Sequence, residues 1–187
     1  GPNVHTHHKI RRGNIDEGFR KADLIVENRF STPRMVHCQL EPYNSFAYVE
    51  NDGTIIIWSS AHQLFSATQG ITCRVFDMPP VKVRVRTSYV GGNFGAQPQA
   101  ERFAALMALK TGKPVRVEYN RKQCFLDGLN RLSSVVYIKD GVKSDGTLLA
   151  REVKYIGNGG AYTNWVPLIL RNGSFGLSTY RMPHLKL

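Results

Sequence analysis

A glycine-rich segment at residues 91–95 constrains the fold of this chain more than any other feature. It reads Gly91, Gly92, Asn93, Phe94 and Gly95. Residues 81–86 before it alternate apolar and basic side chains, as a half-buried strand does. Residues 97–110 after it follow a helical pattern. We therefore expect a strand-to-helix turn whose backbone N–H groups are bared at the positive end of the helix dipole, where a phosphate, an oxyanion or a metal-oxo group can bind.

The glycines alone do not name the ligand of this turn. The segment lacks the G-x-G-x-x-G pattern of dinucleotide-binding proteins and the Gly-Lys-Ser/Thr of a P-loop. A plain turn between a strand and a helix is the simpler alternative, and the segment itself does not choose between the two.

Composition excludes several classes of protein. With 187 residues, 42% of them hydrophobic, the chain can bury the core of one large or two small domains. No run of about 18 apolar residues occurs that would span a membrane. The three cysteines are isolated, with no C-x-x-C pair, so the sequence suggests neither a zinc site nor a disulfide framework. A reducing, cytoplasmic location follows from this cysteine usage.

The chain is strongly basic, with a net charge of +11 from 25 Lys and Arg against 14 Asp and Glu. Such a charge favours an anionic partner, such as nucleic acid, an acidic subunit or a phosphate-bearing cofactor. The basic residues are spread along the chain, however, and the clearest clusters are only doublets. A non-enzymatic module that binds nucleic acid or a partner subunit is therefore an alternative function, and a solvated basic surface is the simplest explanation.

Hydrophobic periodicity predicts a chain dominated by strands. The predicted strands are residues 24–31, 35–40, 45–50, 54–58, 81–86, 115–119, 132–139 and 147–155, and the predicted helices are 15–21, 66–76, 97–110 and 121–126. Turn signals at residues 51–53 and 144–146 predict two hairpins. The expected fold class is therefore α+β, with a mixed β-sheet and two or three packed helices.

A few polar residues are candidates for chemistry. If residues 35–40 form a strand, His37 and Glu41 share a face and could hydrogen-bond, as a catalytic pair or as a buried structural pair. Gln63 follows the predicted strand 54–58, where it could simply begin a helix or donate from its amide to an oxygen ligand.

Two further candidates are weaker. Arg171 ends the apolar run 168–170, where a guanidinium needs an anion or another acceptor unless the run simply ends there. Ser60 and His62 are close in sequence, but no G-x-S-x-G elbow surrounds them, which argues against a serine hydrolase.

Taken together, the motifs resemble the molybdenum-cofactor-binding large subunit or domain of the xanthine dehydrogenase and aldehyde oxidase family, the molybdenum hydroxylases. The resemblance covers nearly the whole chain in the family's order. It is carried by residues 13–19, the His-x-x-Leu-Glu-Pro of 37–42, Gln63 followed by 79–85 and 91–95, the Thr-Gly-Lys-Pro-Val-Arg of 111–116, Asn-Gly-Gly-Ala-Tyr at 158–162 and Tyr-Arg-Met-Pro at 180–183.

The resemblance implies roles for individual residues. Gln63 matches the glutamine whose amide hydrogen-bonds an oxo ligand of molybdenum, which makes it the candidate catalytic residue. Gly91, Gly92, Phe94 and Gly95 match the cofactor-binding loop, and Phe94 matches a residue whose backbone approaches the metal. Arg171 matches an arginine that holds the substrate. The implied reaction hydroxylates an aldehyde or an N-heterocycle at an electron-poor carbon, with oxygen from water.

The same resemblance implies cofactors and partners. The cofactor is molybdopterin with molybdenum, for which the cytosine dinucleotide is one form. Two [2Fe–2S] clusters and FAD lie on other domains or subunits and carry the electrons away. The partners are the remainder of the molybdenum-binding subunit, the iron–sulfur and FAD subunits or domains, and a small-molecule substrate. A membrane or a nucleic acid is not among them.

The chain also departs from the family pattern. Asn93 replaces the third glycine of G-G-G-F-G, and Pro98 stands where purine-oxidising members have a glutamate, which argues against a purine substrate. The family's A-Y/F-R-G-x-G segment and its catalytic glutamate have no counterpart in the chain. We therefore expect residues 1–187 to be part of a single molybdopterin-binding domain, a fragment of a longer chain that is inactive alone.

Overall fold

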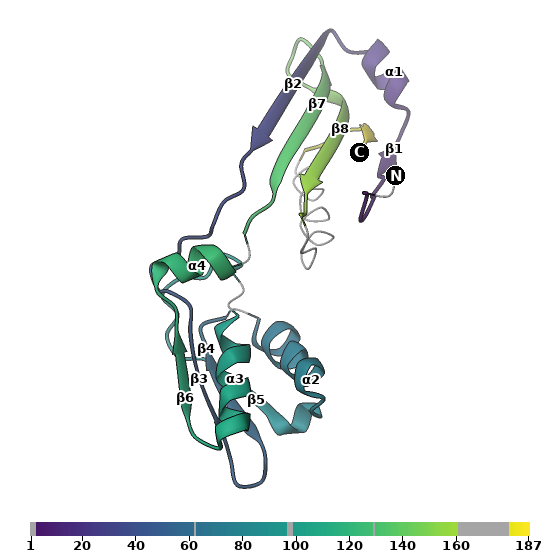
Figure 1. Cartoon of the computed structure of the whole chain (residues 1–187). Helices are drawn as coiled ribbons and strands as arrows, with labels where there is room; N and C mark the ends of the chain where they lie inside the picture. Colours follow the sequence, from purple (N-terminus) through teal and green to yellow (C-terminus); the bar gives the residue numbers. More distant parts are fainter. Residues whose placement is uncertain (1–2, 62, 97–98, 129, 161–179) are drawn as a thin grey trace. The chain divides into compact units, whose positions relative to one another are not determined.

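The computed structural model describes residues 3–61, 63–96, 99–128, 130–160 and 180–187 (Figure 1). The chain divides into two compact units, which are described separately. The first combines residues 1–35 with residues 132–187, and the second is the continuous segment 36–131.

The first unit is built on a five-stranded mixed sheet in the order β1-β9-β8-β7-β2. Its strands are β1 (Arg11–Arg12), β2 (Leu24–Thr32), β7 (Ser133–Val142), β8 (Leu148–Asn158) and β9 (His184–Lys186). Neighbouring strands are antiparallel except β8 and β9, which are parallel. Helix α1 (Ile15–Arg20) begins where the Asn14 side chain accepts the N–H of Glu17, and it packs on β8 and β9.

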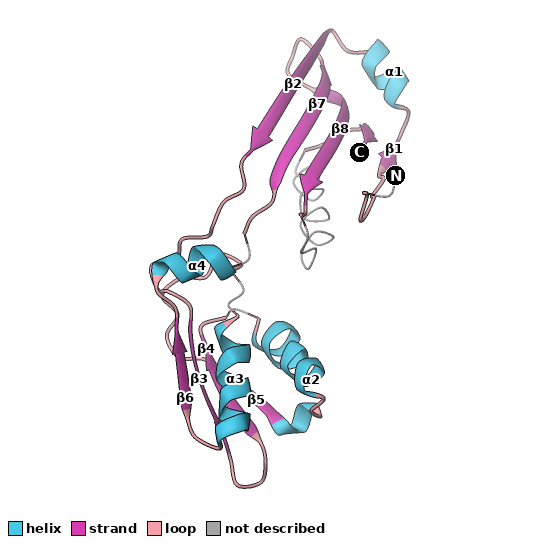
Figure 2. Cartoon of the chain, viewed as in Figure 1, coloured by secondary structure: helices cyan, strands magenta, loops and turns pink. Residues whose placement is uncertain are grey.

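The second unit is built on a four-stranded sheet in the order β5-β4-β3-β6 (Figure 2). Its strands are β3 (Asn44–Val49), β4 (Ile55–Ser59), β5 (Val83–Arg86) and β6 (Val115–Glu118). Strands β4 and β5 are parallel and the other pairs are antiparallel. Its helical segments are the π-helical turn η1 (Leu64–Gln69), α2 (Gly70–Phe76), the 3₁₀ turn η2 (Pro80–Lys82), α3 (Ala100–Thr111) and α4 (Arg121–Asp127).

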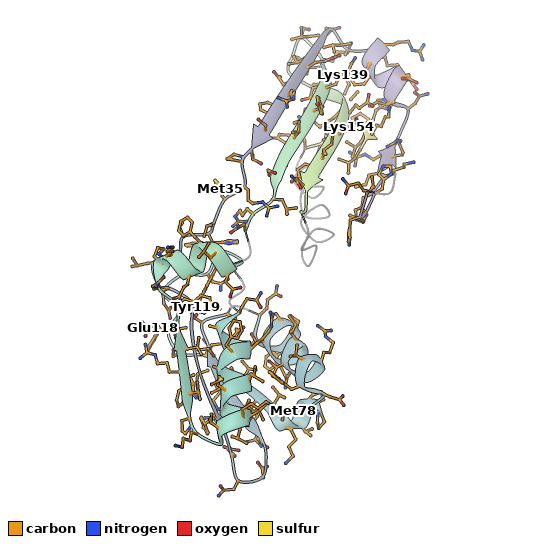
Figure 3. The ribbon with its side chains drawn as sticks, in the orientation of Figure 1. Met35, Met78, Glu118, Tyr119, Lys139 and Lys154 are labelled. Atoms are coloured by element: carbon orange, nitrogen blue, oxygen red, sulfur yellow. The ribbon has the colours of Figure 1, made fainter. Side chains whose placement is uncertain are left out.

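Helix α3 covers this sheet with a face of small residues. The fully buried residues of this cluster are Ala104, Ala105 and Ala108 on the helix and Ala47, Ile55, Ile57 and Val83 on the strands. Alanine side chains let the helix axis come close to the sheet while still excluding water. Met78, labelled in Figure 3, is one of the partly buried side chains that pack against the cluster. The sheet and α3 thus form the rigid base from which the loops of the second unit project.

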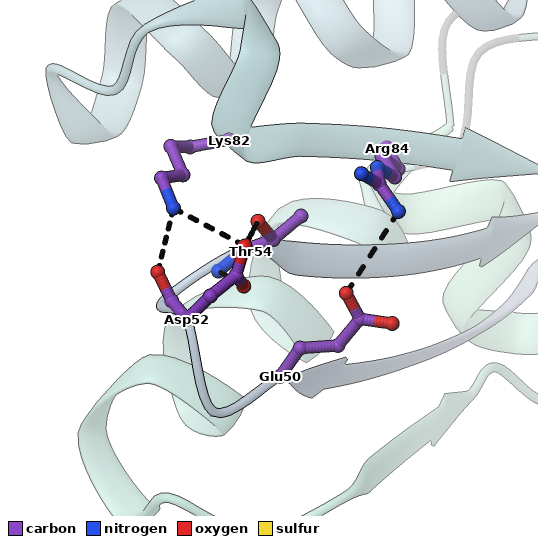
Figure 4. Close-up of polar contacts among 5 residues, drawn as sticks. All are labelled: Glu50, Asp52, Thr54, Lys82 and Arg84. Carbon is purple, nitrogen blue, oxygen red and sulfur yellow. Dashed lines mark hydrogen bonds and ion pairs between the residues drawn. The ribbon is translucent and has the colours of Figure 1, made fainter.

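The two hairpins predicted from turn signals share one turn design. In each, an aspartate carboxylate accepts the N–H of the threonine two residues further on, at 2.9 Å for Asp52 and Thr54 and at 2.9 Å for Asp145 and Thr147. The glycine between them has a positive φ, as such turns require. Figure 4 shows that Asp52 also meets the ammonium of Lys82, at 3.3 Å.

The predicted α+β class is confirmed, although the structure has two mixed sheets where the sequence predicted one, and four predicted elements need correction. The strand at 81–86 begins only at Val83, because residues 80–82 form η2. The strand at residues 35–40 is wrong, because Cys38 has a φ of 48°, which a strand cannot contain. The helix at 97–110 begins only at Ala100, and Pro98 lies outside the described residues. The helix at 66–76 is split into η1 and α2.

Candidate functional site

The glycine-rich loop is fastened to the segment that carries the His-x-x-Leu-Glu-Pro motif. The Gly91 N–H donates to the Glu41 carboxylate (Oε2) at 2.6 Å, and the Glu41 N–H donates to the Gly91 carbonyl at 3.2 Å. The other Glu41 oxygen accepts the Asn44 amide at 2.6 Å. The Glu41 carboxylate therefore anchors the loop, a structural role that the sequence-based pairing with His37 did not foresee.

Gly91 is required by the chain's own packing, and Gly92 by its backbone, whose φ of 105° L-residues rarely adopt. A Cβ on Gly91 would lie 2.7 Å from the Cβ of Glu41, and one on Gly92 would lie 3.2 Å from the Cβ of Gln39. Gly95 is different, because among the described residues the nearest atom to its added Cβ is His37 Nε2, at an ordinary 3.8 Å. The open side of the loop is therefore at Gly95, where a ligand can approach the backbone closely.

The expectation that the loop bares its amides is correct only for its middle. The N–H groups of Gly95 and Ala96 donate to the side chain and the carbonyl of Asn93, at 3.1 and 2.9 Å, and that of Gly91 is used by Glu41. Because α3 begins at Ala100, the loop also lies outside the first helical turn. Within the described part of the chain, the amides of Gly92, Asn93 and Phe94 make no hydrogen bond.

Phe94 holds a conformation that L-residues avoid. Its φ is 53°, and its side chain is 66% exposed, so burial of the ring does not explain the strain. The Phe94 carbonyl accepts the Arg131 guanidinium at 2.7 Å, which helps to fix the peptide. Non-glycine residues in this region concentrate at ligand clamps and active sites.

Gln63 is the N-cap residue of the π-helical turn η1, which confirms that it stands at a helix start. Its carbonyl accepts the N–H groups of Ala67 and Thr68, at 3.2 and 3.1 Å. Its side-chain oxygen accepts the Ser66 hydroxyl at 3.4 Å, while its amide nitrogen has no partner among the described residues. An amide donor is thus available there, on a type of helical turn that is common at functional sites.

The structure brings the loop and the Gln63 segment together. The Asn93 amide nitrogen donates to the Ser60 carbonyl at 3.3 Å, three residues before Gln63. The asparagine that departs from the family's third glycine therefore connects the two predicted parts of the site. In the sequence, Asn93 stands out only because it replaces a glycine of the family pattern. Its contact with Ser60, 33 residues away, could not be predicted from the sequence.

Several predicted residues cannot be placed in this arrangement. Arg171 and His62 lie outside the described residues. Among the residues that the structure describes, no group of three or more His, Cys, Asp or Glu side chains is arranged to hold a metal ion. The chemistry that the arrangement offers is donation from backbone and side-chain amides toward an oxygen-rich, electronegative group.

Titration behaviour at the site follows from burial. Burial raises the pKa of Glu101, although hydrogen bonds from Ser59 and Thr68 act in the opposite direction. Burial likewise raises the pKa of Tyr43, which follows the Glu41 segment. Both groups belong to the interior that supports the loops.

Comparison with known proteins decides the family. The model of the molybdopterin cofactor-binding domain matches residues 1–187. The chain belongs to this family. The resemblance inferred from the motifs is therefore confirmed for the whole chain, and the family does not favour a nucleic-acid-binding module or a serine hydrolase.

Relatives of this molybdopterin-binding chain are much longer than the chain itself. It is 32% identical to the xanthine dehydrogenase molybdenum-binding subunit of Escherichia coli O157:H7, over 88% of this chain and 22% of the relative. It is 27% identical to the nicotinate dehydrogenase large molybdopterin subunit of Eubacterium barkeri, over 99% of this chain and 44% of the relative. The chain thus spans less than half the length of these relatives.

A solved structure shares the fold. The aldehyde oxidoreductase from Desulfovibrio gigas superposes with a TM-score of 0.87 and 28% sequence identity, over 99% of this chain and 21% of that chain.

None of the helices in the described part of our chain is long and apolar enough to cross a membrane.

Proposed function

We propose that this chain supplies part of the molybdopterin site of a molybdenum hydroxylase, an oxidoreductase that adds oxygen from water to an aldehyde or an N-heterocycle. The observation that carries the proposal is the contact between the Gly91–Gly95 loop and the Gln63 segment, in a chain that belongs to the molybdopterin-binding family throughout. The aldehyde oxidoreductase and nicotinate dehydrogenase among the relatives support the two substrate classes.

The described residues fit a molybdopterin group. The unengaged amides of Gly92, Asn93 and Phe94 and the side-chain amide of Gln63 are donors, which suit the oxygen atoms of an oxo-metal centre and a pterin phosphate. Gly95 leaves room for close approach. When bound, the molybdenum centre accepts the electrons that leave the substrate carbon.

In this proposal each residue has one task. Gln63 donates a hydrogen bond to an oxygen of the molybdenum group, and Phe94 and Gly95 hold the cofactor through their backbone. Gly92 offers its N–H, and Gly91 acts indirectly, because it lets Glu41 pack against the loop. Arg171, which lies outside the described residues, is proposed to hold the substrate, and Pro98 disfavours a purine in that place.

The wider assembly is also part of the proposal. Residues 1–187 would be one part of a larger molybdopterin-binding domain, with molybdopterin in a nucleotide form that the chain leaves open, the cytosine dinucleotide being one form. Electrons would pass to [2Fe–2S] clusters and FAD on other domains or subunits. The three free cysteines of the chain favour a cytoplasmic location.

The reaction can be tested on the holoenzyme, purified with its partner subunits. An aldehyde and nicotinate should each be offered in ¹⁸O-labelled water. The nicotinate product should carry the label at a ring carbon. An aldehyde exchanges its own oxygen with water through its hydrate, so after full exchange its acid product should carry two labelled oxygens. Gln63→Ala should lower kcat by about a hundredfold, the usual cost of one donor at a developing negative charge.

A matched control is available at the other end of η1. Gln69 donates its amide to the Val83 carbonyl at 2.7 Å, so it fastens η1 to β5. Gln69→Ala should lower the unfolding midpoint and leave kcat within about twofold, because contacts far from the chemistry act through stability. Product without label, or equal effects of the two variants on kcat, would contradict the proposal.

A further inference from the structure

A buried carboxylate holds the segment that carries Gln63 in the proposed site. Glu101 is on the first turn of α3, shortly after the glycine-rich loop, and it is only 3% exposed. One of its oxygens, Oε1, accepts two hydroxyl groups, from Ser59 at the end of β4 and from Thr68 in η1 at 2.9 Å. Burying a carboxylate is costly unless such partners satisfy it.

The two hydroxyl groups bracket the segment that carries Gln63. On one side, the Ala61 N–H donates to the Ser59 hydroxyl at 2.9 Å, so the chain leaving β4 is held from Glu101 through Ser59. On the other side, Thr68 donates its N–H to the Gln63 carbonyl at 3.1 Å and its hydroxyl to Glu101. The Gln63 backbone is therefore one residue away from the carboxylate in a continuous hydrogen-bonded chain.

The same carboxylate lies on the first turn of a helix that packs on the sheet of the second unit. Helix α3 is fixed to the sheet by its buried alanines, so Glu101 is a rigid point and not a mobile surface group. A carboxylate near a helix N-terminus is also favoured by the helix dipole. Glu101 thus joins the end of β4 and the π-helical turn to the first turn of α3 in one network.

We infer that Glu101 is a positioning residue, which sets the place of the Gln63 amide through Thr68 and Ser59. This inference rests on the proposed role of Gln63 in the molybdopterin site. The buried network would then do more than stabilise the fold. If it were broken, the Gln63 amide would move away from the molybdenum group although the protein stayed folded.

The test uses the holoenzyme with four variants. Thr68→Val removes the hydroxyl and keeps the shape, and Glu101→Ala removes the acceptor altogether. Glu101→Gln keeps an oxygen acceptor for both hydroxyls. Thr72→Val is the matched control, because Thr72 is fully buried one turn further on and its hydroxyl has no hydrogen-bond partner among the described residues.

Two readouts separate positioning from stability. The first is the electron paramagnetic resonance signal of the partly reduced molybdenum, and the second is amide hydrogen exchange over residues 61–70. Thr68→Val is expected to shift the molybdenum signal in the same direction as Gln63→Ala, to lower kcat about tenfold at unchanged KM, and to speed exchange of the amides in η1. Glu101→Gln should restore the wild-type signal, and Thr72→Val should leave it unchanged.

The outcomes distinguish this inference from the function on which it rests. If Gln63→Ala shifts the signal but Thr68→Val does not, although exchange in η1 is faster, Glu101 is merely structural and the inference is overturned while the proposed function stands. If Gln63→Ala itself shifts nothing, or the holoenzyme holds no molybdenum, both fail. Should Glu101→Ala not fold, Thr68→Val alone decides the question.

Discussion

At the residue scale, the structure gives Asn93 a role that the sequence did not indicate. In the sequence it is a departure from a glycine pattern, and nothing local indicates why. In the structure its side chain accepts the Gly95 N–H at 3.1 Å and donates to the Ser60 carbonyl at 3.3 Å. A single side chain therefore shapes the loop and fastens it to the segment before Gln63.

Two substitutions separate these contacts of Asn93. Asn93→Asp keeps an acceptor for Gly95 but has no donor for the Ser60 carbonyl, and Asn93→Ala loses both. We expect Asn93→Asp to destabilise the fold by about 1–3 kcal/mol, since it leaves an acceptor unpaired and places a second anionic oxygen beside a carbonyl, and to bind molybdopterin less tightly. Denaturant unfolding and cofactor content check this, and a fully stable Asn93→Asp with normal cofactor content would contradict the role.

Gly91 provides a second prediction at this scale. Gly91→Ala should destabilise the protein by about 1–3 kcal/mol, because its Cβ would overlap the Glu41 side chain and overpack a tight contact. Gly70→Ala is the control, since the nearest atom to that Cβ is 3.4 Å away and the residue begins helix α2. That change should be neutral or stabilising by up to about 1 kcal/mol. Equal unfolding midpoints for the two variants would show that Gly91 does not contact Glu41.

At the scale of elements, prediction from sequence succeeded where the structure is local. Both hairpins follow from an Asp-Gly-Thr turn, whose carboxylate, glycine and threonine act within four residues. Residues 36–42 failed for the opposite reason. The alternation at 35–40 suggested a strand, but Cys38 has a φ of 48°, and Glu41, which follows, is held by Gly91, 50 residues further along the chain. The π-helical turn also escaped prediction, because its widened hydrogen bonding depends on Glu101 and Thr68.

The β3–β4 turn makes a prediction about pH. The backbone and side chain of Thr54 and the ammonium of Lys82 lower the pKa of Asp52 from 3.8 to about 2 (Figure 4). Because this pKa is lowered on folding, the stabilising effect is complete above pH 3.8 and is lost as the pH falls through about 2.

Asp52→Asn isolates that charge, because an asparagine still offers an oxygen to the Thr54 N–H. Between pH 4 and pH 2 the free energy of unfolding should fall less in the variant than in the wild type. Urea unfolding across that range measures this difference. If the free energy of unfolding falls equally in both proteins over this range, the Asp52 carboxylate does not make the contacts that the structure shows.

At the scale of the whole molecule, every described residue of the candidate site comes from one unit. Gln63, the Gly91–Gly95 loop and Glu101 all lie within residues 36–131, which form a continuous segment with its own sheet and core. Sequence motifs gave the family and the order of these parts. They did not give the contacts that join them, since Glu41, Asn93 and Glu101 act across gaps of more than 30 residues.

The first unit offers a different surface. Its sheet carries Lys139 and Lys154 on β7 and β8, seen in Figure 3, and Lys139 is paired with Glu27 at 2.6 Å. A half-buried, paired Lys139 and an exposed Lys154 account for part of the high positive charge as an ordinary solvated surface. The strong basicity that the sequence displays is therefore compatible with a cofactor-binding role and does not require a nucleic acid.

The central claim is that the backbone amides of Gly92, Asn93 and Phe94 and the side-chain amide of Gln63 meet molybdopterin. Its most direct test is the molybdenum and pterin content of the purified protein with its partner subunits, measured by mass spectrometry of the metal and by fluorescence of the oxidised pterin. We predict one molybdenum and one pterin for each copy of this chain, with a marked loss in Asn93→Asp. Protein that is folded, pure and assembled with its partners but contains neither molybdenum nor pterin would contradict the claim.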